Sequence, residues 1–164
     1  MDNDKRIVKF GKFAGYAGMI DFIHGLGDRM LTMGYSTPFL HLGYTHMYQG
    51  LEAAKDAVRG VGEQIKQRGM PDIFLPMIFV FTGTGSVMKG AKEIFELLPH
   101  EWITKEQMHE LFEKKKWRRD VIYATIASSD QIVKPIDEDK VFDKKDYYQN
   151  PQNYQSTFAQ DFGR

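Results

Sequence analysis

Residues 76–95 constrain the fold more than any other stretch, because they have the pattern of a buried strand, a tight turn and a helix. Ile78–Phe81 is a continuous apolar run of β-branched and aromatic residues, which is typical of a parallel strand covered on both faces. Gly83 and Gly85 then allow a sharp turn, with positive φ where it is needed. Apolar residues follow at helical spacing, so one helix face is expected to pack back on the sheet: Val87, Ala91, Ile94, Phe95 and Leu98.

A turn of this kind predicts a phosphate site. The free N–H groups of the first helical turn and the helix dipole attract an anion, and dinucleotide-binding folds hold a pyrophosphate in this way. The full dinucleotide fingerprint has a third glycine where this chain has Met88, and Gly90 comes two residues later. A triphosphate loop is rejected, because Ala91 stands where that loop needs Lys. An ordinary strand-to-helix turn that binds nothing remains the alternative.

Composition excludes several function classes. The chain has 164 residues, of which 42% are hydrophobic, so one domain with a substantial core is expected. Lys plus Arg and Asp plus Glu number 22 each, and this balance predicts neither a nucleic-acid nor a membrane partner. The absence of Cys excludes disulfides, thiolate zinc sites and cysteine catalysis. Met1–Arg6 resembles neither a secretory signal nor a mitochondrial presequence.

The first 70 residues predict two helices joined by a loop. Gly11–Gly34 has the pattern of a helix that is apolar nearly all round, and Gly15 and Gly18 lie on a bare stripe along it. Each interior glycine costs about 1 kcal/mol relative to Ala, which implies close packing or ligand approach. The alternative is a glycine-rich loop with a shorter helix from Ala17. Leu51–Arg68 is strongly amphipathic, and Gly69 is its expected C-cap.

The loop between these two helices is rich in aromatic residues and histidines. His41 and His46 are five residues apart, and with His24 they form no recognisable metal set. We expect them to be hydrogen-bonded at a loop or an interface.

Two further strands are expected after the glycine turn. His100–Ile103 is a short strand, and Thr104 and Gln107 form a capping box that opens a helix to about Lys116. Val121–Ile126 is the third strand, and Ser128, Ser129 and Asp130 follow it at the carboxyl edge, where ligands of such sheets bind. From Pro135 the chain is expected to be mostly irregular, with a short helix near Lys144–Tyr148.

The tip of the second strand bears on the choice of cofactor. An NAD site usually places an acid there, but the strand is followed by Thr104 and Lys105, and Glu101 is expected to sit within the strand. This arrangement favours NADP weakly over NAD.

Several segments together resemble one enzyme family, lysine–ketoglutarate reductase, the N-terminal part of the bifunctional α-aminoadipic semialdehyde synthase. The likeness runs from about Lys5 to Phe158. The segments that carry it are Phe10–Ile20, Thr37–Phe39, Phe79–Ala91, Leu98–Pro99, Tyr147–Pro151, Tyr154 and Phe158. The displaced Gly90 is also found in that family.

The resemblance implies a fold similar to alanine dehydrogenase, with a substrate domain and a nucleotide domain joined by long helices. The expected fold class is therefore α/β, a partial Rossmann-like parallel sheet with flanking helices, preceded by a long connector helix. Residues 1–70 would be connector helices and loop, 71–136 the nucleotide-binding core, and 137–164 an irregular C-terminal segment. The cofactor-binding residues it implies are Gly83, Thr84, Gly85, Ser86 and Val87 at the pyrophosphate, and Ser128 and Asp130 near the nicotinamide.

The resemblance also implies a function. The family condenses lysine with 2-oxoglutarate and reduces the imine to saccharopine with NADPH. Its Lys and His acid/base groups belong to a domain that precedes the matched segment, so no catalytic residue and no metal ligand is assigned here. We expect the NADP(H)-binding portion of a reductase, incomplete for catalysis, with NAD as the alternative cofactor.

Two alternatives stay open beside this expectation. The first is a catalytically inactive relative that associates with itself or with a full-length reductase; the second is a truncated product without a settled function. The compartment is mitochondrial by resemblance, and cytoplasmic if the chain stands alone, since no presequence is visible.

Overall fold

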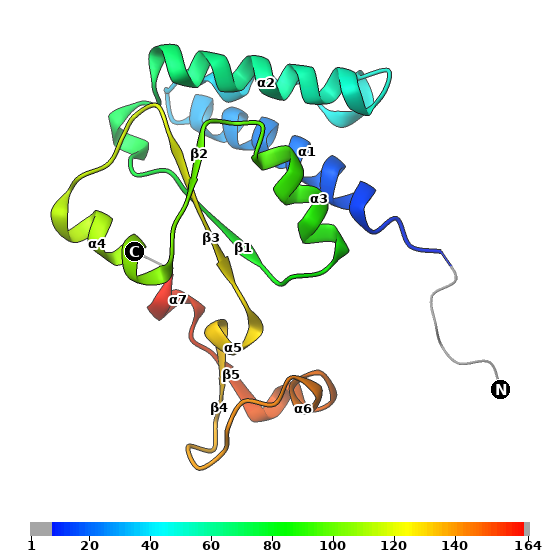
Figure 1. Cartoon of the computed structure of the whole chain (residues 1–164), viewed down its shortest axis with the longest axis vertical. Helices are drawn as coiled ribbons and strands as arrows, with labels where there is room; N and C mark the ends of the chain where they lie inside the picture. The colour runs from blue at the N-terminus through cyan, green and yellow to red at the C-terminus, as the bar shows by residue number, and fades with distance from the viewer. Residues whose placement is uncertain (1–7, 163–164) are drawn as a thin grey trace.

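A three-stranded parallel sheet lies at the centre of the structure, a computed structural model that describes residues 8–162 (Figure 1). Its strands are β1 (Ile78–Thr82), β2 (His100–Trp102) and β3 (Ile122–Ala127). β3 pairs in parallel with both other strands. Thr82 of β1 lies opposite Ala127 of β3, and His100 of β2 lies opposite Ile122 of β3. The three predicted strands and their parallel direction are confirmed.

The order of the strands is β1-β3-β2, so the strand that comes last in the chain is the central one. In the dinucleotide-binding half of a doubly wound fold, each strand lies beside the next one along the chain. Here β1 and β2 are both edge strands. The segment that follows β3 therefore lies beside the glycine turn that follows β1.

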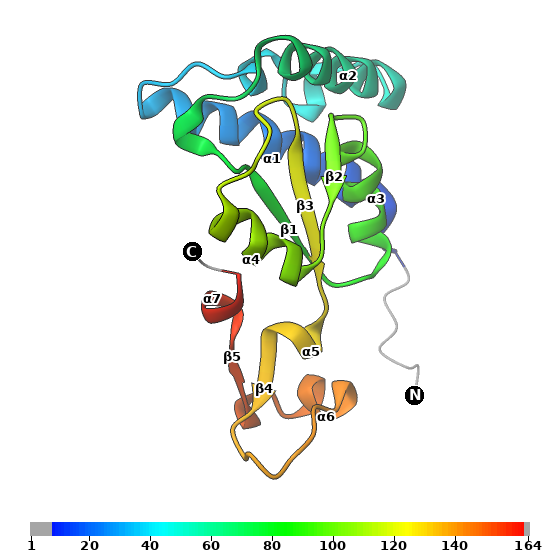
Figure 2. The ribbon, with the colours of Figure 1, turned by 60° about the vertical axis from the view of Figure 1, so that its left-hand side comes forward.

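Helices cover both faces of this sheet (Figures 1 and 2). The α-helices are α1 (Lys12–Thr32), α2 (Leu51–Arg68), α3 (Ser86–Phe95), α4 (Lys105–Lys114), α5 (Ser129–Ile132), α6 (Lys144–Gln149) and α7 (Phe158–Asp161). Short 3-10 helices are η1 (Pro38–His41), η2 (Thr45–Met47), η3 (Asp72–Phe74) and η4 (Pro151–Asn153). A separate antiparallel pair joins β4 (Val133–Pro135) to β5 (Tyr154–Ser156). Within the described residues, no helix has both the length and the apolar character needed to cross a membrane.

The two faces of the sheet carry cores of very different size. On the face covered by α1 and α3, Phe79 and Phe81 pack against the fully buried Phe95, with ring centroids 5.2 and 5.3 Å apart. This core continues outward to α2. On the other face, a smaller core forms around Met108 of α4 and Tyr123 of β3. Coverage of the sheet on both faces, as the sequence predicts, is confirmed.

The bare stripe of α1 has a packing reason inside this chain. Gly15 lies against α3 so closely that a Cβ there would stand 1.9 Å from the carbonyl oxygen of Val87. From the other side, a Cβ on Gly90 would stand 2.0 Å from the carbonyl oxygen of Lys12. The two glycines therefore let α1 and α3 touch backbone to backbone. Gly18 shows no such contact.

Most predicted element boundaries are confirmed, and two predicted side-chain positions are wrong. α2 spans the predicted residues, with Gly69 at φ +71° as its C-cap. Val87, expected against the sheet, is 52% exposed, because the first turn of α3 packs against α1 through its backbone. Lys55, expected on the water-facing side of α2, is largely covered because it reaches a carboxylate on α3.

The C-terminal part contains more regular structure than the sequence predicts. The short helix expected near Lys144–Tyr148 is α6. The β4–β5 pair was not predicted, because each strand is only three residues long and has no alternating apolar pattern. β4 precedes the predicted boundary at residue 136 and β5 follows it, so hydrogen bonds cross that boundary.

Candidate functional site

The turn between β1 and α3 lies at the carboxyl edge of the sheet. Gly83 has φ +80°, a backbone conformation that glycine adopts readily and other residues rarely do. Its N–H donates to the carbonyl oxygen of Ala127 at 3.1 Å. The amide of Gly83 is therefore used within the fold, and this residue shapes the turn.

Gly85 is the N-cap of α3 and has an extended backbone, with φ −78° and ψ −175°. Any residue can adopt that conformation, and a Cβ built on Gly85 meets no atom within 4 Å. Neither the backbone nor the packing of the described chain therefore requires glycine at this position. A requirement for glycine would come from a group that approaches the backbone from outside.

The first turn of α3 offers N–H groups for such an approach. The N–H of Lys89 bonds to the carbonyl oxygen of Gly85 at 3.1 Å and begins the helical ladder. The N–H groups of Ser86, Val87 and Met88 come before it, and no side chain caps this end of the helix. They leave a partial positive charge at the turn. The residues of the turn thus fit the diphosphate of a dinucleotide.

Ser128 and Asp130 lie beside this turn, since β3 is the neighbour of β1. Ser128 is the N-cap of α5, and its N–H and hydroxyl both contact Oε1 of Gln131, at 3.0 and 3.1 Å. This capping box was not predicted, although the Ser-x-x-Gln spacing was a readable signal for it. Asp130 is exposed in the first turn of α5.

Two cavities flank the carboxyl edge of the sheet. A largely apolar groove of about 620 Å³ runs between α1, β1 and α3, and Gly85, Ser86 and Val87 line it. A second cavity of about 540 Å³ lies at the tip of β2, where Thr104 and Lys105 are among its lining residues. Three of the seven predicted cofactor residues thus share one groove, whereas Ser128 and Asp130 line neither cavity.

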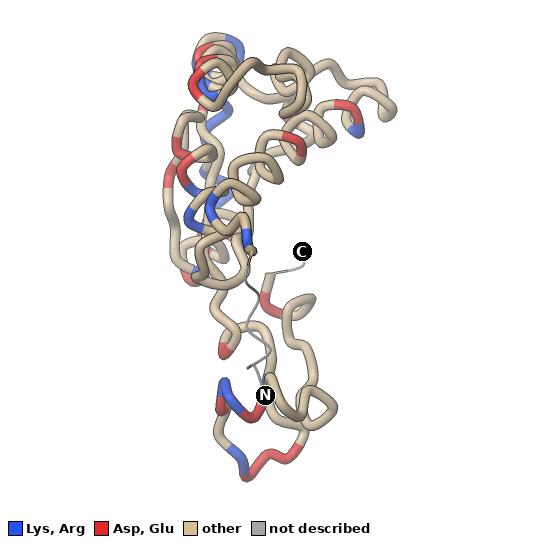
Figure 3. The backbone as a smooth tube through the Cα atoms, turned by 90° about the vertical axis from the view of Figure 1, so that its right-hand side faces the viewer, with Lys and Arg blue, Asp and Glu red and all other residues tan. Residues whose placement is uncertain are grey.

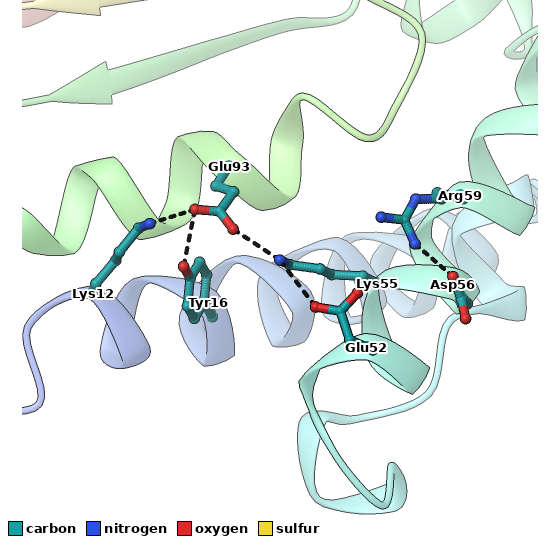
Figure 4. A network of polar contacts seen from close by, with 7 residues as sticks. All are labelled: Lys12, Tyr16, Glu52, Lys55, Asp56, Arg59 and Glu93. Carbon is teal, nitrogen blue, oxygen red and sulfur yellow. Dashed lines mark hydrogen bonds and ion pairs between the residues drawn. The ribbon is translucent and has the colours of Figure 1, made fainter.

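A carboxylate on α3 ties the helix to its two neighbours (Figure 4). Glu93 accepts from Nζ of Lys12 at 2.5 Å and Nζ of Lys55 at 2.8 Å, and the Tyr16 hydroxyl donates to it at 2.9 Å. The hydrogen bonds from Lys12, Lys55 and Tyr16 lower the pKa of Glu93 to about 2. The same carboxylate raises the pKa of Lys12 and of Lys55 above the usual lysine value. These contacts fix α3, and with it the glycine turn, against α1 and α2.

The tip of β2 carries both a lysine and an acid, since Lys105 and Glu106 line the cavity there. Glu101 is within the strand, and Lys105 begins α4. However, Nζ of Lys105 lies 2.6 Å from Oδ1 of Asp161, and this contact lowers the pKa of Asp161. The charge of Lys105 is therefore already paired within the chain.

The histidines contribute to the packing of the loop that follows α1. Nδ1 of His24 contacts the carbonyl oxygen of Leu42, and its ring lies 3.9 Å from that of Tyr44. The expected hydrogen bond at the loop is confirmed for His24, which lies on α1. Among residues 8–162, no group of three or more His, Asp or Glu side chains is arranged to hold a metal ion.

Comparison with known proteins shows which proteins this chain is similar to. No protein-family model matches the chain. The chain is 48% identical over 166 residues to the alpha-aminoadipic semialdehyde synthase of Arabidopsis thaliana, a match that covers 96% of the chain. It is 41% identical over 157 residues to the protein of that name from Mus musculus and 40% identical over 157 residues to that from Bos taurus. This chain is homologous to one segment of the alpha-aminoadipic semialdehyde synthases.

The match covers nearly all of this chain but only a small part of each relative. It covers 95% of the chain in both mammalian comparisons, but only 16% of the length of each of the three relatives. The names of the two mammalian proteins include the word mitochondrial. The resemblance expected from the sequence is confirmed over nearly the whole chain.

Proposed function

We propose that this segment binds a nicotinamide dinucleotide at the turn between β1 and α3, as part of a lysine–ketoglutarate reductase. NADP(H) is the cofactor that the resemblance implies, and NAD(H) is the alternative. The observation that carries the proposal is Gly85, a glycine that the described chain itself does not require, placed where the N–H groups of α3 are open. Homology to aminoadipic semialdehyde synthases over nearly the whole chain supports it.

Each residue of the turn has a distinct part in this proposal. Gly83 makes the bend and stays bonded to Ala127, so it positions the turn without contacting the ligand. Thr84 and Gly85 let the diphosphate approach the backbone, and Ser86 and Val87 donate their N–H groups to it.

The segments that follow two neighbouring strands, β1 and β3, would both contact the cofactor. Ser128 and Asp130 follow the strand adjacent to β1, and they would lie beside the dinucleotide at the same edge. When bound, the cofactor would supply the hydride for reduction of the imine formed from lysine and 2-oxoglutarate. Proton transfer to the substrate needs a side chain within hydrogen-bond reach. We assign that part to groups outside this segment.

A titration of the purified chain with NADPH, followed by the fluorescence of the nucleotide, tests the proposal. The variant Gly85→Ala adds a methyl group where the folded chain has open space, so its free energy of unfolding should be close to that of the wild type. The methyl group would meet the diphosphate, and binding should weaken by about tenfold or more.

Gly60→Ala is the matched control. Gly60 is exposed within α2, and a Cβ there also meets no atom within 4 Å. It should leave the affinity for NADPH unchanged. Absence of binding at millimolar nucleotide, or equal affinity in the Gly85→Ala variant, would contradict the proposed site.

A second candidate function, association with another protein, is favoured by the free edge of β1. Because Tyr123 donates its N–H to Met77 and Gly83 donates to Ala127, the odd-numbered residues of β1 face β3. The N–H and C=O groups of Ile78, Val80 and Thr82 therefore face away from β3, and Val80 and Thr82 line the apolar groove. Such an edge is open to pairing. Light scattering during size-exclusion chromatography separates the two functions. A monomer that binds NADPH supports the first, and a stable oligomer that does not bind it supports the second.

A further inference from the structure

We propose that a pocket at the opposite edge of the sheet from the glycine turn binds a phosphate group, either free phosphate or a phosphate monoester. This pocket has a volume of about 310 Å³ and is formed by three segments that are far apart in the chain. They are the loop between α1 and η1, the C-terminal end of α2, and the residue Arg119 ahead of β3. The inference goes beyond the dinucleotide site and does not depend on it.

A buried hydroxyl without a partner first marks this pocket as a site. Thr37 lines the pocket and is only 2% exposed, and its Oγ1 has no hydrogen-bond partner among the described residues. Thr37 is the N-cap of η1, where a Thr side chain usually accepts a backbone N–H, but no such bond forms here. Buried polar groups are nearly always hydrogen-bonded, and this one has no partner within the described chain.

The charged side chains around Thr37 indicate that the ligand of this pocket is an anion. Arg68 and Arg119 both line the pocket, whereas no Asp or Glu does. Nε of Arg119 contacts Oδ1 of Asp72 at 3.0 Å and the carbonyl oxygen of Met70 at 3.4 Å. Among the described residues, no hydrogen bond uses the terminal nitrogens of Arg119, and Arg68 makes no ion pair.

Two further donors complete the lining. Gln64 and His41 line the same pocket as the two arginines, and each side chain can donate a hydrogen bond. The lining therefore carries two guanidinium groups, one of which is also paired with Asp72, in a chain with no net charge. Figure 3 shows that charges of both signs are otherwise interspersed along the backbone.

The backbone around the pocket is fixed before any ligand arrives. The N–H of Met70 donates to the carbonyl oxygen of Arg119 at 2.8 Å, which links the end of α2 to the start of β3. Gly69 has φ +71°, and a Cβ on it would lie 2.9 Å from Cβ of Arg119. The backbones at Arg68 and Arg119 are thus held near each other by contacts between adjoining residues, and binding would have to order only the two exposed side chains.

The arrangement of donors favours phosphate over a carboxylate. A carboxylate has two oxygens in one plane and is matched by a single guanidinium fork. Here two guanidinium groups, an amide and a hydroxyl belong to three separate segments that surround one small volume. A tetrahedral group with three or four acceptor oxygens can bond to all of them at once, and arginine is well suited to this recognition.

Calorimetric titration of the 164-residue chain at constant ionic strength tests the inference. The ligands are inorganic phosphate, methyl phosphate and succinate, each against a chloride background. We expect saturable binding of one or both phosphates in the millimolar range or tighter, and weaker binding of succinate. Tighter binding of methyl phosphate than of phosphate identifies a monoester as the ligand, and the reverse identifies free phosphate.

Variants locate the binding in this pocket. Arg68→Gln and Arg119→Gln should each weaken phosphate binding by about tenfold or more. The control Arg59→Gln removes an exposed arginine of the same helix, one that pairs with Asp56, and should change binding by less than about twofold. Thr37→Val replaces the unpaired hydroxyl with a methyl group. It should weaken binding while leaving the thermal midpoint without phosphate equal or higher.

Four results would overturn the inference. They are the absence of saturable heat with either phosphate, equal or tighter binding of succinate, an equal loss in Arg59→Gln, and unchanged binding in Arg68→Gln. If Arg119→Gln does not fold, Arg68→Gln and Thr37→Val decide the matter on their own. Unchanged phosphate affinity in Thr37→Val is a fifth such result.

Discussion

Replacement of Gly90 by Ala tests whether the contact between α1 and α3 holds the site in place. The added Cβ would stand 2.0 Å from the carbonyl oxygen of Lys12 and 3.2 Å from Cα of Gly15, and both are backbone atoms. They cannot rotate away, so the two helices would have to separate by about 1 Å at this point. Overpacking of this kind costs about 1–3 kcal/mol, and sometimes more.

The same substitution also has a favourable effect, because Ala is a better helix former than Gly by about 1 kcal/mol. Gly60→Ala isolates that gain, since Gly60 is exposed in α2 and a Cβ there meets no atom within 4 Å. Urea unfolding followed by circular dichroism should show Gly60→Ala more stable than the wild type and Gly90→Ala less stable. The difference between the two variants estimates the steric cost directly, about 1–3 kcal/mol.

A further comparison distinguishes a shared contact from a general defect. Gly15 and Gly90 face each other, so separation of the helices by one substitution relieves the other. The double variant should therefore lose less stability than the sum of the single variants. Equal stabilisation by Gly90→Ala and Gly60→Ala would refute the reasoning, because it would mean that α1 and α3 do not touch at these glycines.

Two further predictions concern electrostatics and capping. Glu93→Gln should make the free energy of unfolding depend less on pH in the acid range. The pKa of Glu93 is lowered in the folded chain from 4.5 to about 2. Its contribution to the free energy of unfolding is therefore present above about pH 4.5 and is lost as the pH falls toward 2. Urea midpoints measured across that range should fall more steeply in the wild type than in the variant. Thr104→Ala removes the side chain that accepts from the N–H of Gln107 at the start of α4. It should cost about 1 kcal/mol in urea unfolding, whereas Thr104→Ser should recover most of the loss.

The sequence predicts the elements whose signals are local. α2 follows from its periodic apolar face and the glycine at its end, and α4 follows from the capping box at Thr104 and Gln107. The strand before Gly83 follows from a short apolar run bounded by Pro and Gly. In each of these cases the residues that decide the structure lie within a few positions of one another.

Features that depend on distant residues could not be predicted in this way. Lys55 looks like a solvent-facing residue of an amphipathic helix, and only the position of Glu93 on α3 explains why it is covered. Gly90 looks like a displaced fingerprint glycine, but its partner is α1, about 75 residues earlier in the chain. The pocket around Thr37 also escapes prediction, because its two arginines are 51 positions apart in sequence.

The strand order changes the argument about the cofactor. The sequence favours NADP because Thr104 and Lys105 directly follow the second strand, but β3 separates β2 from β1 and Lys105 is paired with Asp161. The strand end that does adjoin the glycine turn is that of β3, and an exposed carboxylate, Asp130, follows it. A carboxylate beside the turn suits the hydroxyls of a ribose and repels a 2′-phosphate. If this segment binds NADPH, as the resemblance implies, the adenosine ribose should therefore lie away from β3, over the free edge of β1.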